Sequence, residues 1–60
     1  MMNCIVIDDE PLALDLLKDY IEKIPFLELE RTFTNPIEAL GYLQENKVDL
    51  VFLDVELPYL

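Results

Sequence analysis

The sequence predicts an α/β fold in which three parallel strands lie in the order 2-1-3 and two helices connect them. Segments with strand and helix periodicity alternate along the chain as β-α-β-α-β, which specifies a parallel sheet with right-handed crossovers. Two of the three predicted strands, 3–7 and 50–53, contain continuous apolar runs, typical of strands covered on both faces. These two strands should therefore be central neighbours, with the remaining strand outside the first.

The chain is short and acidic, which limits the partners it can have. It has 60 residues, 53% of them hydrophobic, and a formal net charge of −9 from 4 Lys/Arg and 13 Asp/Glu. Nucleic-acid contacts and anionic membrane surfaces both require clustered basic residues. We therefore expect no direct contact with nucleic acid or membrane. A divalent cation or a basic protein is compatible with this charge.

The first strand and helix follow from residues 3–24. Residues 4–7 are apolar, and Cys4 is expected to be a small buried strand residue rather than a reactive thiol. Pro11 is tolerated in the first turn of a helix. The predicted helix spans 12–24 and ends before Pro25. Its inward positions recur at steps of three and four residues: Leu14, Leu17, Ile21 and Ile24.

The second half of the chain predicts an edge strand, a second helix and a buried strand. In 27–33, Leu27, Leu29 and Phe33 alternate with Glu28, Glu30 and Thr32, and Arg31 breaks the apolar side. One wet face is typical of an edge strand. The helix should span 36–46, capped by Thr34 or Asn35. The residues expected to point inward are Ile37, Leu40 and Leu43. The strand 50–53 then ends at Asp54.

Acidic residues follow both apolar strands. Asp8 and Asp9 come directly after the first strand in VIDDEP, and Asp54 follows the third in VFLDVELP. Open α/β sheets form their sites at the carboxyl ends of the strands, so these carboxylates should converge. Grouped carboxylates repel one another unless a cation lies among them. Mg²⁺ prefers such oxygen ligands, and an aspartyl oxygen can accept a phosphoryl group.

A simpler interpretation competes with this one. Acidic residues after a strand often form only a solvated turn or a helix N-terminus. For Glu10, next to Pro11, that interpretation is preferred, and for Asp8 or Asp9 alone the two are evenly balanced. Because Asp54 ends a second buried strand beside the first, the two motifs together favour a site.

The segments VIDDEPLAL and LVFLDVELP resemble the receiver domain of two-component response regulators, and the first resembles the LytTR-type transcriptional regulators. The resemblance covers all 60 residues. It implies a flavodoxin-like doubly wound sheet, of which 1–60 would be the amino-terminal half without an effector domain. Asp54 would take a phosphoryl group from a sensor histidine kinase. Asp9 would bind Mg²⁺ directly, Asp8 would support it through water, and the Glu56 carbonyl would be a further ligand.

The chain departs from the family by its length. The family's later strands supply a Ser or Thr and a Lys near the phosphoryl group, and Lys47 does not match that Lys because it precedes the third strand. The resemblance implies a phosphoacceptor that assists its own phosphorylation rather than a conventional enzyme. DNA contact would belong to an effector domain of the parent protein. Met1 and Met2 lead into the first strand without a basic region, so a cytoplasmic location is expected.

Three other possibilities are weighed. A catalytically silent interaction or dimerisation fragment would keep the fold without phosphorylation at Asp54. A P-loop hydrolase needs a glycine-rich loop, and Gly41 is the only glycine. An aspartate-based phosphatase would usually have Asp at the position of Glu56. Finally, strand 50–53 would have a flat apolar edge, so we expect self-association through it or poor folding.

Overall fold

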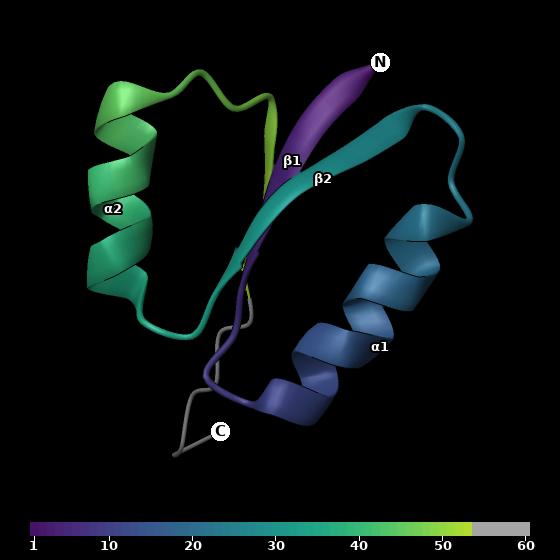
Figure 1. The fold of residues 1–60 in the computed structure, drawn as a ribbon, viewed down its shortest axis with the longest axis horizontal. Helices are drawn as coiled ribbons and strands as arrows, with labels where there is room; N and C mark the ends of the chain where they lie inside the picture. Colours follow the sequence, from purple (N-terminus) through teal and green to yellow (C-terminus); the bar gives the residue numbers. More distant parts are fainter. Residues whose placement is uncertain (54–60) are drawn as a thin grey trace, which may run out of the picture.

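The computed structural model describes residues 1–53, and the predicted order of elements is confirmed. The strands are β1 (Met2–Ile7), β2 (Leu27–Phe33) and β3 (Leu50–Leu53), and the helices are α1 (Pro11–Glu22) and α2 (Pro36–Glu45). All pairs are parallel and the sheet order is β2-β1-β3. The two helices lie on opposite sides of the sheet (Figure 1). Among these residues, neither helix is long and apolar enough to cross a membrane.

Both helices begin at proline, which was predicted for α2 and lies one residue before the predicted start of α1, and they end one or two residues before their predicted limits. At α2 the Asn35 side chain accepts a hydrogen bond from the Ile37 amide at 2.9 Å. Asn35 rather than Thr34 is therefore the capping residue. At α1 the capping position is Glu10, whose side chain makes no capping hydrogen bond. The backbone amides at the start of α1 therefore need hydrogen-bond acceptors other than the Glu10 side chain.

The face of the sheet under α1 is an apolar core, and the predicted inward face of this helix is confirmed. Its buried residues are Cys4, Val6, Leu14, Ile21 and Leu27, with Leu17, Ile24, Leu29, Leu50 and Phe52 packed around them. The Cys4 side chain is 0% exposed. Burial, and then the negative charge of Glu30, raises the pKa of its thiol. Cys4 is therefore a buried core residue, as predicted, and not a reactive thiolate.

The face of the sheet under α2 has a different set of core residues, and the inward orientation predicted for two residues of this helix is wrong. Its buried residues are Ile5, Ile7, Phe33 and Ala39, with Tyr42, Leu43 and Val48 beside them. Leu43 packs inward as predicted, whereas Ile37 is 75% and Leu40 60% exposed. The helix is rotated so that Ala39, a small residue, faces the sheet.

A stack of side chains accounts for this rotation. The Arg31 guanidinium lies 4.9 Å from the centre of the Phe33 ring and 5.3 Å from that of Tyr42. The two rings are tilted, with their centres 5.4 Å apart. Such contacts are favourable when a cation lies over aromatic faces. They hold Tyr42 against β2, and Ile37 and Leu40 consequently lie away from β2.

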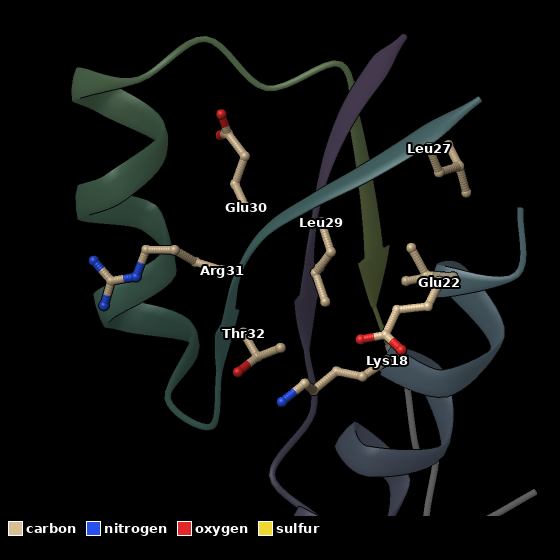
Figure 2. A pocket seen from close by; sticks show the side chains of 8 residues that line it. Lys18, Glu22, Leu27, Leu29, Glu30, Arg31 and Thr32 are labelled. Carbon is tan, nitrogen blue, oxygen red and sulfur yellow. The ribbon is translucent and has the colours of Figure 1, made fainter. Parts of the chain in front are cut away.

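A β-bulge at Glu30 changes which face β2 presents. Cys4 of β1 pairs with Leu29, but the next residue, Ile5, pairs with Arg31, so Glu30 is the extra residue. Figure 2 shows Glu30 and Arg31 both extending toward α2, while Thr32 extends the other way. The prediction that Leu27, Leu29 and Phe33 share one face is therefore wrong. The two leucines belong to the α1 face and Phe33 belongs to the α2 face.

The third strand is covered on one face only. Leu50 and Phe52 pack against the core under α1. On the other face Val51 is 37% and Leu53 56% exposed. The prediction of a strand covered on both faces is thus wrong for one face, because α2 packs over β1 and β2 and leaves Val51 and Leu53 uncovered.

A hydrogen-bond network joins the amino end of the sheet around Asn3. The Asn3 side-chain oxygen accepts from the Asp49 amide at 2.8 Å, and its side-chain nitrogen donates to the Lys47 carbonyl at 3.0 Å. The same nitrogen donates to the Glu30 carboxylate at 3.3 Å, which also accepts from the Tyr42 hydroxyl at 3.1 Å. The Asn3 amide in turn donates to the Asp49 carboxylate at 3.0 Å. The network connects β1, β2, α2 and the segment that leads into β3.

Candidate functional site

The acidic turn at the carboxyl end of β1 is anchored to the neighbouring strand. Asp8 is only 4% exposed, and within residues 1–53 it is the one charged residue that is buried. Its backbone amide donates to the Phe33 carbonyl at 3.0 Å, so the turn begins where β2 ends. The sequence predicted both strand ends, but it did not predict this hydrogen bond. Phe33 therefore fixes the position from which the turn leaves the sheet.

The two adjacent aspartates lie in different environments. One carboxylate oxygen of Asp8 (Oδ1) accepts from the Glu10 amide at 2.9 Å. That hydrogen bond satisfies a backbone donor at the start of α1, which the Glu10 side chain leaves without a cap. Asp9, in contrast, is exposed. The Asp8 carboxylate is thus held by the turn, and the Asp9 carboxylate is open to solvent.

The register between β1 and β3 aligns the ends of the two central segments. Cys4, Ile5, Val6 and Ile7 pair in order with Leu50, Val51, Phe52 and Leu53. Asp8 and Asp54 are the next residues in the sequence after the last of these pairs. The predicted phosphoacceptor Asp54 and the predicted carbonyl ligand Glu56 both lie outside the described residues. The structure therefore places two of the four predicted ligands, Asp8 and Asp9, at one turn.

The donor atoms at this turn suit a hard cation. Carboxylate oxygens are the ligands that Mg²⁺ prefers, usually one or two of them together with water. Within residues 1–53, no three Asp, Glu, Cys or His side chains are grouped closely enough to hold a metal ion. Asp8 and Asp9 thus fit a magnesium site in chemistry, as part of a set whose other predicted members are Asp54 and Glu56.

A separate groove runs between α1 and β2 (Figure 2). Leu27, Leu29 and Ile21 form its apolar part, and charged residues including Lys18 and Glu22 border it. The acidic turn contributes no residue to this groove. None of the residues that line the groove is among those predicted for the site, so the acidic turn remains the candidate site.

Comparison with known proteins gives a consistent result. The family described as response regulator receiver domain matches residues 4–60. The chain is 37% identical over 59 residues to the transcriptional regulatory protein YpdB of Escherichia coli strain K12, covering 98% of this chain and 24% of that protein. It is 29% identical over 58 residues to the transcriptional regulatory protein BtsR of the same strain, covering 97% and 24%.

A further relative is an uncharacterized response regulatory protein of Shewanella oneidensis, 36% identical over 58 residues, covering 97% of this chain and 25% of that protein. No solved structure matches the chain significantly. The chain spans about a quarter of the length of the curated relatives it matches.

Proposed function

The chain belongs to the response regulator receiver family, and we propose that it accepts a phosphoryl group on Asp54 from a histidine of a sensor kinase. The observation that supports this most directly is the strand register. Ile7 is paired with Leu53, and an aspartate follows each of them in the sequence. Neighbouring parallel strands that end together deliver the next residues to the same edge of the sheet.

The environments of Asp8 and Asp9 support distinct roles. Asp9 is exposed, so its carboxylate is available to bind Mg²⁺ directly. Asp8 is buried and already accepts the Glu10 amide, which leaves its second oxygen to act through water. Asp54 and the Glu56 carbonyl would complete the protein ligands. When bound, Mg²⁺ would offset the negative charge of the phosphoryl oxygens.

The proposed transfer needs only one new covalent bond in this chain. A carboxylate oxygen of Asp54 bonds to phosphorus as the bond from phosphorus to the histidine nitrogen breaks, and the electron pair stays on that nitrogen. Asp8 and Asp9 hold charge and position, and neither becomes covalently modified. The chain is in this sense a phosphoacceptor that assists its own modification.

The names of the relatives indicate a wider role for the protein. Two of them are named transcriptional regulatory proteins, and this chain corresponds to about a quarter of their length. We propose that residues 1–60 are the amino-terminal half of a receiver domain in a cytoplasmic regulator. A LytTR-type effector domain elsewhere in that protein would contact DNA.

The test is the intact mass of the chain after incubation with acetyl phosphate and Mg²⁺. We expect the addition of one phosphoryl group, its absence in Asp54→Asn, and its absence when EDTA removes Mg²⁺. Glu10→Gln is the matched control, because Glu10 is an exposed acid of the same turn to which no ligand role is assigned.

The alternative function is a silent interaction fragment that keeps the fold. A folded chain that gains no phosphoryl group, or a gain that persists in Asp54→Asn, would contradict the proposal for these residues. Circular dichroism of the same samples shows whether the chain is folded.

A further inference from the structure

The acidic turn begins beside the last residue pair that β1 and β2 share. Ile7 pairs with Phe33, and both side chains are buried in the core under α2. Asp8 follows Ile7 in the sequence, and its backbone amide donates to the Phe33 carbonyl at 3.0 Å. The backbone of Asp8 is therefore held between a covalent neighbour in β1 and a hydrogen-bond acceptor in β2.

The side chain of Phe33 anchors the end of β2. Phe33 is the last residue of this strand, and the ends of elements open at low free energy where few apolar contacts hold them. Here the ring is only 5% exposed, and the Arg31 guanidinium lies 4.9 Å from its centre. A cation over an aromatic face is favourable. The ring therefore keeps the Phe33 carbonyl in place where the turn leaves the sheet.

The position of the Asp8 backbone determines the position of its carboxylate. The side chain is 4% exposed, and its Oδ1 accepts from the Glu10 amide at 2.9 Å. The Glu10 carbonyl in turn accepts from the Leu14 amide at 3.1 Å. A series of hydrogen bonds thus runs from Phe33 through Asp8 into α1. A side chain buried and held in this way has little freedom to compensate for a displacement of its backbone.

A magnesium site is sensitive to such a displacement. Mg²⁺ demands near-ideal octahedral geometry, and residues that orient metal ligands affect the metal affinity without touching the ion. The Phe33 side chain has no oxygen or nitrogen that could bind a metal ion. Any influence of Phe33 on Mg²⁺ must therefore pass through Asp8.

We propose that Phe33 is a positioning residue of the acidic turn. Its buried ring fixes its carbonyl, the carbonyl fixes the Asp8 amide, and the Asp8 carboxylate is thereby oriented for Mg²⁺ and its water. The effect on Mg²⁺ rests on the proposed function. The anchoring of the turn does not, because it can be measured without metal.

Amide hydrogen exchange, measured by NMR without Mg²⁺, tests the anchoring. Phe33→Leu removes the ring and keeps an apolar residue in the core. We expect the exchange rate of the Asp8 amide, divided by that of the Val6 amide in the middle of β1, to rise by about fivefold, as for the loss of one hydrogen bond. The ratio is used because global unfolding exposes both amides alike. Phe33→Met, whose flexible side chain fills irregular space in a core, replaces Phe33→Leu if that variant does not fold.

Ile5→Val is the matched control for the exchange experiment. Ile5 is 0% exposed in the same core, but it is not adjacent to the turn. Ile5→Val should therefore lower the stability of the chain and leave the exchange ratio as in the parent. An unchanged ratio in the folded Phe33 variant, or an equal rise in Ile5→Val, would overturn the proposal.

Isothermal titration calorimetry with Mg²⁺ tests the consequence for the metal. We expect Phe33→Leu to weaken Mg²⁺ binding by the folded chain by about tenfold, and Ile5→Val to bind like the parent. Equal affinities of the parent and Phe33→Leu would overturn the inference and leave the proposed function intact. A parent that binds no Mg²⁺ would instead contradict the proposed function, and the exchange ratio would then decide the anchoring of the turn by itself.

Discussion

The two ends of the sheet are built on opposite principles. At the amino end, the Asn3 network satisfies polar groups from β1, β2, α2 and the segment that leads into β3. At the carboxyl end, Asp8 is held by two hydrogen bonds and Asp9 is exposed. Like charges placed side by side raise the free energy of a fold unless a ligand offsets them. The amino end thus provides stability, and the carboxyl end retains carboxylates for binding.

The largest effect on stability should come from Asn3→Ala. Its side chain makes hydrogen bonds to Asp49, Lys47 and Glu30, and the loss of such bonds costs about 0.5–1.5 kcal/mol each. We expect the free energy of unfolding to fall by about 1–3 kcal/mol, measured by urea denaturation. The affinity of the folded variant for Mg²⁺ should stay unchanged.

Asn46→Ala is the control for this change. Asn46 donates a single side-chain hydrogen bond, to the Tyr42 carbonyl at 3.0 Å. Its loss should cost less than the loss of the Asn3 side chain. If the two variants were equally stable, the special role of Asn3 at the amino end would be wrong.

Asp9→Asn at the carboxyl end should have the opposite effects: weaker Mg²⁺ binding and nearly unchanged stability. Removing an exposed carboxylate should weaken Mg²⁺ binding by about tenfold or more, which is about 1.4 kcal/mol of binding free energy. Stability without Mg²⁺ should change by less than about 0.5 kcal/mol. Isothermal titration calorimetry and urea denaturation measure the two quantities. A variant that loses stability but binds Mg²⁺ normally would remove the distinction between the two ends.

A smaller, stabilising change is available in α2. Gly41 lies inside α2, and a Cβ added there would contact nothing within 4 Å. Replacing an interior helical glycine by alanine typically adds about 0.5–1 kcal/mol. Gly41→Ala should therefore raise the urea midpoint and leave Mg²⁺ binding and phosphorylation unchanged. A loss of either activity would show that α2 and the acidic turn are coupled.

The smallest expected effect is a change in how the stability of the chain depends on pH. Burial, then the hydrogen bond to Glu30 and its negative charge, raises the pKa of Tyr42 above its usual 10.0. The folded chain therefore keeps this proton at a pH where the unfolded chain loses it. The resulting stabilisation is complete below about pH 10 and is lost as the pH rises through the raised pKa.

Tyr42→Phe removes this titration while leaving Cys4 in place. Above about pH 10, the stability of the parent should fall more steeply with pH than that of the variant. Urea denaturation at several alkaline pH values measures the two slopes. Parallel slopes would mean that Tyr42 does not contribute to the network in its neutral form.

The features that the sequence predicts correctly depend on local pattern. The spacing of Leu14 and Ile21 indicated the buried face of α1, and the proline positions indicated where both helices begin. The order 2-1-3 followed from which strands are continuously apolar. The acidic turn also followed, because Asp8 comes directly after a buried strand. Each of these conclusions needs only neighbouring residues and the general rules of parallel sheets.

The features that it misses depend on contacts between distant residues. The rotation of α2 is set by Arg31 and Phe33 of β2 against Tyr42, and helical spacing alone favoured Ile37 and Leu40 as inward residues. The role of Asn3 depends on Asp49, 46 residues away. Arg31 was the one visible signal, since it broke the alternation of its strand. That break marked the bulge.

The bulge at Glu30 has a consequence for how this strand can be aligned with those of relatives. Before it, the side chains of β2 that reach a core serve α1, and after it Phe33 serves α2. Deleting Glu30 would join Leu29 directly to Arg31 and replace the bulge by regular pairing, in which Phe33 keeps its partner Ile7 and its place on the α2 face. A single-residue gap at this point therefore leaves the partners of every residue that follows unchanged, whereas a gap elsewhere in the strand would turn the residues on one side of it to the opposite face.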